Sequence, residues 1–149
     1  MSMSYAPMFS KLKDEQSFKM KYIKMCMEQK ELSDSQRIFC IETEETVKGF
    51  PDVMKVIIDK VNTVYFYEFK FSDKNGKIKF QPTQPSFYRH NRALNVEVVA
   101  YNQKTEKLHI FKAESLFDIN SPYKMNEKAE VNLCLAEKGG EYEGTYNKS

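Results

Sequence analysis

The sequence has 149 residues, of which 41% are hydrophobic and 13% aromatic, and its net charge is +2. This composition excludes a disordered or low-complexity chain, because it supplies enough apolar side chains for one packed domain. No stretch approaches the ~18 consecutive apolar residues of a membrane-spanning helix, and the N-terminus lacks the basic and apolar regions of a secretory signal. We therefore expect a cytoplasmic protein that does not enter a membrane.

The hydrophobic pattern of the first half of the chain predicts one helix followed by three strands. Apolar residues at helical spacing predict the helix over residues 10–32. Strands are expected to follow over residues 37–43, 53–58 and 64–71, with turns at 44–49 and 59–62. Asn75-Gly76 is typical of a tight turn after the third strand.

The second half of the chain predicts a helix and two further strands. The helix is expected over residues 83–93, with Thr83 as its N-cap and Pro85 in its first turn, where a missing N–H costs nothing. The later elements are strands over 95–101 and 108–111, a short helix over 113–117 and a flexible tail over about 138–149. The predicted fold class is a single α/β domain over residues 1–149, with a central mixed sheet of about five strands, flanking helices and a core over about 10–117.

The third predicted strand carries two charges among aromatic side chains. Alternation along the strand places Phe66, Glu68 and Lys70 on one face, with the two charged residues ~7 Å apart. Such charges are costly in a buried strand unless something pairs with them. Three interpretations remain open: Glu68 and Lys70 pair with each other, they form a solvated edge pair, or Glu68 binds a divalent cation while Lys70 faces a substrate anion.

A second carboxylate favours the metal interpretation. Asp52 precedes the second strand, and the fifteen residues between it and Glu68 suit a β-hairpin that brings the two carboxylates together. Two carboxylates and an adjacent backbone carbonyl form an oxygen site for Mg²⁺ or Mn²⁺ rather than zinc. Such a metal activates water and neutralises a phosphoryl oxygen, while Lys70 orients or deprotonates the water. Alternatively, Asp52 merely ends a turn after Pro51.

A basic block follows the third strand. Residues 69–92 hold six basic residues against Asp73 alone. The block indicates contact with a nucleic-acid backbone, and the interleaved Phe80, Phe87 and Tyr88 indicate base stacking. A solvated charged face is the alternative. The expected nucleic-acid-binding residues are Lys74, Lys77, Lys79, Arg89 and Arg92.

The order of these motifs resembles a known group of enzymes. Pro51-Asp52 followed by Glu68-Phe69-Lys70 resembles the PD-(D/E)xK nuclease superfamily, and Gln84-Pro85-Ser86-Phe87-Tyr88 resembles the Q-x-x-x-Y element of several of its families. The Gly-Phe-Pro-Asp form and the helix that begins with a Gln are most similar to small virus-type replication-repair nucleases and Holliday junction resolvases. The resemblance covers residues 38–111 and extends weakly to the first helix.

The resemblance implies a restriction-endonuclease-like core and hydrolysis of phosphodiester bonds, in DNA rather than RNA, with branched, flap or junction structures as candidate substrates. It implies a Mg²⁺ or Mn²⁺ ion held by Asp52, Glu68 and the backbone carbonyl of Phe69, with Glu15 as a further candidate ligand. Lys70 would act on the attacking water, and Gln84 and Tyr88 would position the substrate.

Other interpretations stay open. Glu15 is also explained as part of a solvated helix face, and Tyr88 as a core residue. The chain is also explained as a catalytically inactive nuclease-fold module that binds nucleic acid or protein, or as an interaction protein whose acidic and basic blocks meet a partner. A homodimer is left open, because cleavage of a junction needs two sites related by symmetry.

Overall fold

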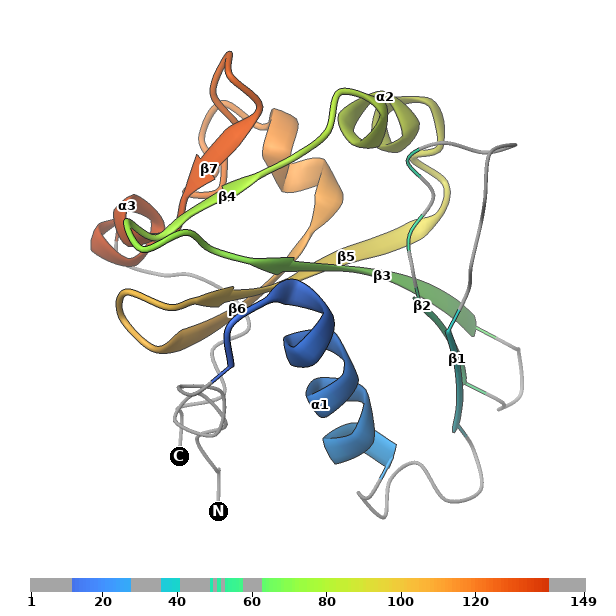
Figure 1. Ribbon diagram of the computed structural model, residues 1–149. Helices are drawn as coiled ribbons and strands as arrows, with labels where there is room; N and C mark the ends of the chain where they lie inside the picture. The colour runs from blue at the N-terminus through green and yellow to red at the C-terminus, as the bar shows by residue number, and fades with distance from the viewer. Residues whose placement is uncertain are drawn as a thin grey trace.

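A mixed five-stranded sheet forms the centre of the computed structural model, which describes residues 12–27, 36–40, 49, 51, 53–57 and 63–139. Its strands lie in the order β1-β2-β3-β5-β6 (Figure 1). The strands are β1 (Gln36–Cys40), β2 (Val53–Ile57), β3 (Thr63–Phe71), β5 (Asn95–Asn102) and β6 (Lys107–Lys112). β3 and β5 are parallel and the other neighbours antiparallel, so the predicted mixed sheet of about five strands is confirmed.

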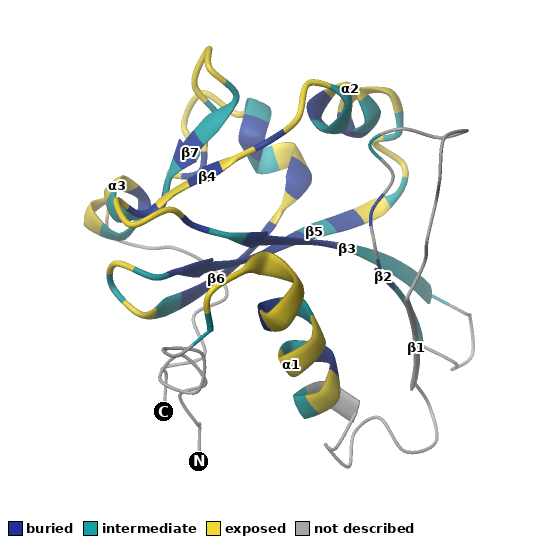
Figure 2. Cartoon of the chain, in the orientation of Figure 1, coloured by how far each residue is buried: buried dark blue, intermediate teal, exposed yellow. Residues whose placement is uncertain are grey.

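Different elements cover the two faces of this sheet. One face is covered by α1 (Glu15–Met27), which lies below the sheet in Figure 1. On the other face lie α2 (Thr83–His90), the 3-10 helix η3 (Ala113–Phe117), the strands β4 (Lys77–Lys79) and β7 (Glu130–Asn132), and α3 (Leu133–Lys138). The sheet therefore lies between two buried clusters, and Figure 2 shows dark buried segments along its strands.

The alternation predicted for β3 is confirmed by these clusters. Tyr67, Phe69 and Phe71 pack in the cluster between α1 and the sheet, whereas Phe66 packs in the cluster on the opposite face of the sheet. Successive side chains of a strand point to opposite faces. Glu68 and Lys70 therefore lie on the face of α2 and β4.

The first helix begins later than predicted. Residues 12 and 13 are not helical, and α1 starts at Glu15 because Asp14 caps it: its Oδ1 accepts a hydrogen bond from the Ser17 backbone N–H at 2.7 Å. This backbone hydrogen bond lowers the pKa of Asp14. The rest of the expected range, residues 10–11 and 28–32, lies outside the described residues, as do 41–48 and 58–62 of the predicted strands and turns.

The second helix also differs from its prediction. Thr83 is its first helical residue rather than its N-cap; the cap is Pro82, which supplies no side-chain hydrogen bond. Pro85 lies in the first turn, as predicted. The helix ends at His90, before the predicted residue 93, where Asn91 leaves helical geometry and its Nδ2 donates to the Phe87 carbonyl at 2.9 Å.

The short strands β4 and β7 and the helix α3 were not predicted. Three-residue strands are too short to show an alternating pattern, and these two are stabilised by contacts that the local sequence does not show, their pairing with each other and the burial of Ile78 and Val131. The buried cluster extends through them to Val131, Leu133 and Ala136, beyond residue 117, where the expected core ends. Residues 140–149 of the expected tail lie outside the described residues. No helix in the described ranges is long and apolar enough to cross a membrane.

A buried polar network joins α3 to the β5–β6 hairpin. The His109 side chain is fully buried; its Nε2 lies 2.9 Å from Glu137 Oε2 and its Nδ1 lies 2.9 Å from the Tyr123 hydroxyl. Asn102 and Thr105 also donate to Glu137, each at 2.8 Å. Burial lowers the pKa of His109, against the raising effect of Glu137. The neutral ring therefore donates from Nε2 to Glu137 and accepts from Tyr123 at Nδ1.

We expect this network to make stability depend on pH. The pKa of His109 in the native protein lies below its usual 6.5. As the pH falls, His109 therefore binds a proton in the unfolded chain before it does so in the native protein. The free energy of unfolding should fall as pH drops below 6.5, with a slope of at most ~1.4 kcal/mol per pH unit from this group. Urea unfolding between about pH 8 and about pH 5 measures it.

The control for this prediction is His109→Gln, whose amide can donate to Glu137 and accept from Tyr123 without titrating. The free energy of unfolding of this variant should change less with pH just below 6.5 than that of the wild-type protein. Burial raises the pKa of Glu137, but hydrogen bonds from Thr105, His109 and Asn102 lower it overall. The stability contributed by this carboxylate is therefore lost at lower pH in both proteins. Identical pH profiles would contradict the assignment of neutral His109.

Gly49 is required by a close approach to α2. Its φ is +84°, and a Cβ at this position would overlap the Thr83 carbonyl oxygen and lie 2.9 Å from Phe87 Cβ. We expect Gly49→Ala to lower the free energy of unfolding by more than about 1 kcal/mol, measured by urea unfolding. The matched control is Gly139→Ala, whose Cβ would meet its nearest atoms at 3.5 Å and should cost little. Equal stability of the two variants would contradict this account.

Candidate active site

A buried lysine on β3 is fixed by the first turn of α2. The Lys70 side chain is only 7% exposed, and its Nζ donates to Gln84 Oε1 at 2.9 Å. Gln84 Oε1 also accepts from the Gln81 backbone N–H at 3.0 Å. The Lys70 Nζ further lies 4.8 Å from the centre of the Phe80 ring. A lysine amine has three donors, so the contact with Gln84 orients the group without exhausting it.

Glu68 lies on the same face of β3, two residues before Lys70, and is 3% exposed. Neither side chain is therefore part of a solvated edge pair, and that interpretation is wrong. The ion pairs within the described part of the chain do not join Glu68 to Lys70. The metal interpretation stays a prediction.

The edge of β3 changes neighbours at this point. β2 pairs with β3 as far as Val53 opposite Tyr67. From Glu68 to Phe71, β3 has a neighbouring strand in the sheet only on the β5 side, as far as the described residues show. The two charged residues therefore follow the point where the described pairing with β2 ends.

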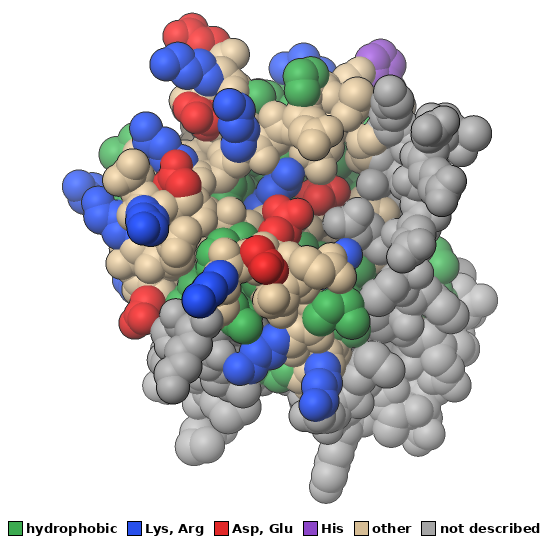
Figure 3. Space-filling model, viewed as in Figure 1, with side chains coloured by type: hydrophobic (Ala, Val, Ile, Leu, Met, Phe, Trp, Pro, Cys, Tyr) green, Lys and Arg blue, Asp and Glu red, His purple; other side chains and the backbone are tan. Residues whose placement is uncertain are grey.

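A pocket of about 340 Å³ opens beside Lys70. Its lining comes from α1, β3, the turn after β3, β4 and β7, and comprises Glu15, Lys70, Phe71, Ser72, Asp73, Lys77, Lys79 and Glu130. Figure 3 shows acidic side chains near the centre of this face, above the N-terminal end of α1, with basic side chains close by. Glu15 and Lys70, far apart in the sequence, thus line one pocket.

Asp52 lies outside the described residues, so its expected place beside Glu68 stays a prediction. Its neighbours in the sequence are described. Val53 is buried and pairs with Tyr67, and Pro51 is buried. Three residues before Asp52, Gly49 lies against Thr83, which directly precedes Gln84 in α2.

Two of the three aromatic residues of the basic block are buried, and the third, Phe87, is partly buried. Phe80 and Tyr88 are 2% and 3% exposed, and their rings contact edge to face at 6.3 Å between centroids. The expectation that they stack on a base is therefore wrong for this structure, because both belong to the core. Tyr88 lines a different cavity from Lys70, so the structure does not bring it to the pocket.

The basic residues expected to bind nucleic acid divide into groups. Lys77 and Lys79 are exposed on β4 and line the pocket beside Lys70. Lys74 is exposed in the turn before them. Arg89 lies over the Phe117 ring at 4.5 Å, and Arg92 lines the second cavity.

The sequence analysis missed two acidic residues that line the pocket, Asp73 and Glu130. Asp73 shapes the turn after β3, since its Oδ1 accepts from the backbone N–H groups of Asn75 and Lys77 at 2.8 and 3.0 Å. The sequence marks Asp73 only as a turn residue. Nothing in that pattern indicates that it also lines the pocket. No sequence signal places Glu130 here, because β7 was not predicted.

The oxygen donors fit a hard divalent cation better than zinc. The Glu68 carboxylate is buried on the same face of β3 as Lys70, and Glu15 provides a second carboxylate in the lining of the pocket. Among the described residues no three carboxylate, histidine or cysteine side chains gather closely enough to hold a metal by themselves. A metal site here would therefore include backbone oxygens, water molecules or a side chain outside the described residues.

Comparisons with known proteins give likeness at the level of the fold. No family model and no curated protein matches the chain. Among solved structures, a nuclease from a fusselovirus is 15% identical, covers 84% of this chain and 89% of its own, and gives a TM-score of 0.49. The Holliday junction resolvase Hjc of Archaeoglobus fulgidus is 12% identical, covers 81% of this chain and 99% of its own, with a TM-score of 0.49.

Proposed function

We propose that this protein is a divalent-metal-dependent nuclease that hydrolyses phosphodiester bonds in DNA. The observation that carries the proposal is the buried Lys70 amine, held by Gln84 beside a pocket and on the same face as the buried Glu68. A protein interior accepts two such groups only where partners satisfy them. A metal ion on Glu68 and an anionic substrate near Lys70 would each place an opposite charge beside one of these buried groups.

The metal would be Mg²⁺ or Mn²⁺, held by Asp52, Glu68 and the Phe69 carbonyl, with Glu15 as a further ligand. When bound, it would lower the pKa of a water molecule and neutralise charge on a phosphoryl oxygen. Glu15 supports this assignment through its position at the pocket that Lys70 also lines. The buried neighbours of Asp52 in the sequence, Pro51 and Val53, support it as well.

Lys70 would act directly on the reacting groups. Gln84 takes one of its three N–H donors, and the others can reach a phosphoryl oxygen and the attacking water. A donor fixed before the reaction stabilises developing charge without the cost of reorganisation. Gln84 would thus be a positioning residue for Lys70, and Tyr88 would support α2 from the core.

The substrate proposed is DNA with a limited structural feature, such as a branch, flap or junction. Lys77 and Lys79 present exposed charge beside the pocket, Lys74 lies in the turn before them, Arg89 lies in α2 and Arg92 lies in the turn after it. The net charge of +2 is too small for a protein that coats DNA. For a junction substrate the proposal includes a homodimer, because two symmetric cuts need two sites.

We expect cleavage of a labelled DNA panel (single strand, duplex, flap and four-way junction, with RNA for comparison) to require Mg²⁺ or Mn²⁺ and to stop with EDTA. Glu68→Gln and Lys70→Met should each lower the cleavage rate by at least about 100-fold, since each removes a group that acts on the transition state. Gln84→Ala should lower it by about tenfold, because Lys70 loses its orientation.

The matched control is Gln81→Ala, on the same turn as Gln84. Gln81 is hydrogen-bonded to Gln84 through its backbone N–H and its backbone carbonyl, which alanine keeps, so this variant should keep its rate within about twofold. Full activity of Glu68→Gln or Lys70→Met would refute the assigned roles. Folded protein that binds DNA equally well with EDTA and never cleaves would instead be an inactive nuclease-fold binding module.

We also expect Lys77 and Lys79 to bind phosphates. The double variant Lys77→Ala/Lys79→Ala should reduce the slope of log affinity against log salt by about 1.8 on duplex DNA, because each lost phosphate contact changes it by about 0.9. Fluorescence anisotropy over a salt series measures this slope. The control Lys104→Ala/Lys124→Ala removes two exposed lysines that do not line the pocket and should leave the slope unchanged. Equal slopes in both variants would remove these lysines from the interface.

A further inference from the structure

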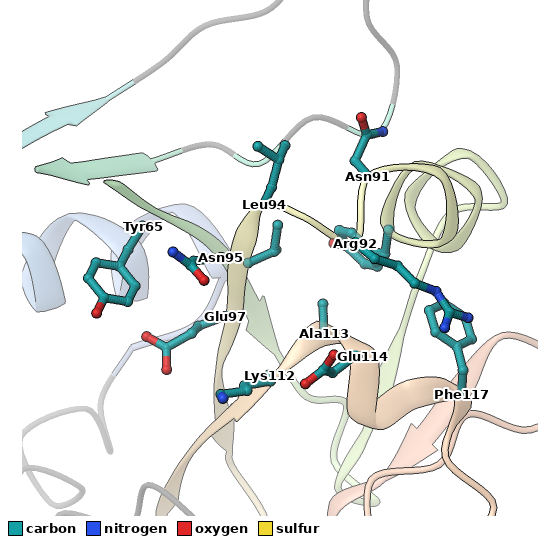
Figure 4. Close-up of a pocket in the computed structure, with 12 residues that line it drawn as sticks. Tyr65, Asn91, Arg92, Leu94, Asn95, Glu97, Lys112, Ala113, Glu114 and Phe117 are labelled. Atoms are coloured by element: carbon teal, nitrogen blue, oxygen red, sulfur yellow. The ribbon is translucent and has the colours of Figure 1, made fainter. Parts of the chain in front are cut away.

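A second cavity, of about 380 Å³, lies between the C-terminal end of α2, the start of β5, the end of β6 and η3 (Figure 4). Its floor is formed by core residues, among them Tyr88, Val96 and Ala113. Its volume and its apolar floor with a few polar groups are typical of a small-molecule or base-binding site. The function proposed above assigns it no role.

The charges around this cavity balance. Arg92 and Lys112 contribute positive charge, and Glu97 and Glu114 contribute negative charge. A phosphate group would meet both carboxylates at close range and gain little. The cavity therefore favours a neutral ligand with polar edges.

The polar groups of the cavity include several acceptors. Asn95 Nδ2 donates to the Val64 carbonyl at 3.2 Å, which leaves its Oδ1 to accept from a ligand. The carboxylates of Glu97 and Glu114 only accept when ionised. Figure 4 shows Asn95 and Glu97 near the ring of Tyr65 on one side, with Glu114 reaching in from η3 on the other. Such a lining suits a flat ligand with N–H donors on its edge.

We propose that this cavity binds an unpaired adenine or cytosine base in the DNA strand that is cleaved, a proposal that rests on the nuclease function proposed above. The exocyclic amino group of either base would donate to Asn95 Oδ1, Glu97 or Glu114, whereas thymine has no amino group and its one ring N–H lies between two carbonyl oxygens. Tyr65 supplies an aromatic ring for stacking, and each stacked base adds affinity of a kind that does not depend on sequence.

The fold links the cavity to the candidate active site. Helix α2 contacts Lys70 through Gln84 in its first turn, and Tyr88, one turn later, lines the cavity. Along the sheet, Val96 of the cavity floor pairs with Phe66, four residues before Lys70. This separation is ~13 Å along the strand. The captured base would lie about four stacked nucleotides from the cleaved bond, at 3.4 Å each.

The test measures binding without cleavage. Fluorescence anisotropy in EDTA compares labelled oligo(dA), oligo(dC) and oligo(dT) of about twelve nucleotides, a length that spans both sites. The wild-type protein should bind oligo(dA) or oligo(dC) about tenfold more tightly than oligo(dT). In Asn95→Leu/Glu114→Leu, a change of two exposed side chains, the preference should fall to within about twofold.

The matched control is Asn120→Leu/Glu127→Leu, which removes the same chemical groups from exposed positions outside both cavities and should keep the preference. Equal binding of the three oligonucleotides by the wild-type protein, or a preference that survives in the cavity variant, would overturn the base site alone. Absence of binding to any oligonucleotide would overturn the nucleic-acid partner as well. Displacement of oligo(dA) by free deoxyadenosine monophosphate at equal affinity would assign the cavity to a free nucleotide and overturn capture within a strand.

Discussion

The hydrogen bond between Lys70 and Gln84 joins the central sheet to the helix that covers it, and the proposed chemistry depends on it. A buried amine is costly unless its donors are satisfied, so the Gln84 side chain must stay where β3 needs it. Gln84 is held in turn by the Gln81 backbone, and the preceding Thr83 lies against Gly49. The start of α2 is therefore constrained from both sides.

The two faces of the sheet divide structural from chemical roles. The face covered by α1 is aromatic. The Phe18 ring packs against the rings of Phe69 and Tyr101, with centroids 6.0 and 5.8 Å apart. This packing stabilises the sheet without polar groups, since apolar burial is the main favourable contribution to folding. The opposite face of the same strand carries Glu68 and Lys70. The alternation of a strand thus lets one segment supply both the core and the candidate site.

The C-terminal elements complete that second face. β7 pairs with β4 and places Lys77 and Lys79 opposite Asn132 and Glu130. α3 is tied to the β5–β6 hairpin through the carboxylate of Glu137, which accepts three hydrogen bonds. α3 also contacts β4, which lines the pocket. The hydrogen bonds of Glu137 therefore help to hold one wall of the candidate site in place.

Local sequence patterns determined the elements that are long enough to show a period. They predicted α1, the three strands up to β3, α2, β5 and β6 and the alternation of Glu68 and Lys70, because spacing fixes which side chains share a face. The predicted start of α1 and the predicted N-cap and end of α2 were wrong, since helix boundaries depend on single hydrogen bonds.

Only the tertiary structure decided what depends on contacts between distant segments. β4 and β7 exist because they pair, and Glu15 and Glu130 reach the pocket of Lys70 from opposite ends of the chain. The fate of Phe80 and Tyr88 was decided in the same way: their sequence neighbours are basic, yet packing buries both. The sequence by itself determined which residues can carry the chemistry, and long-range packing decided which of them meet, because burial is a property of the whole fold.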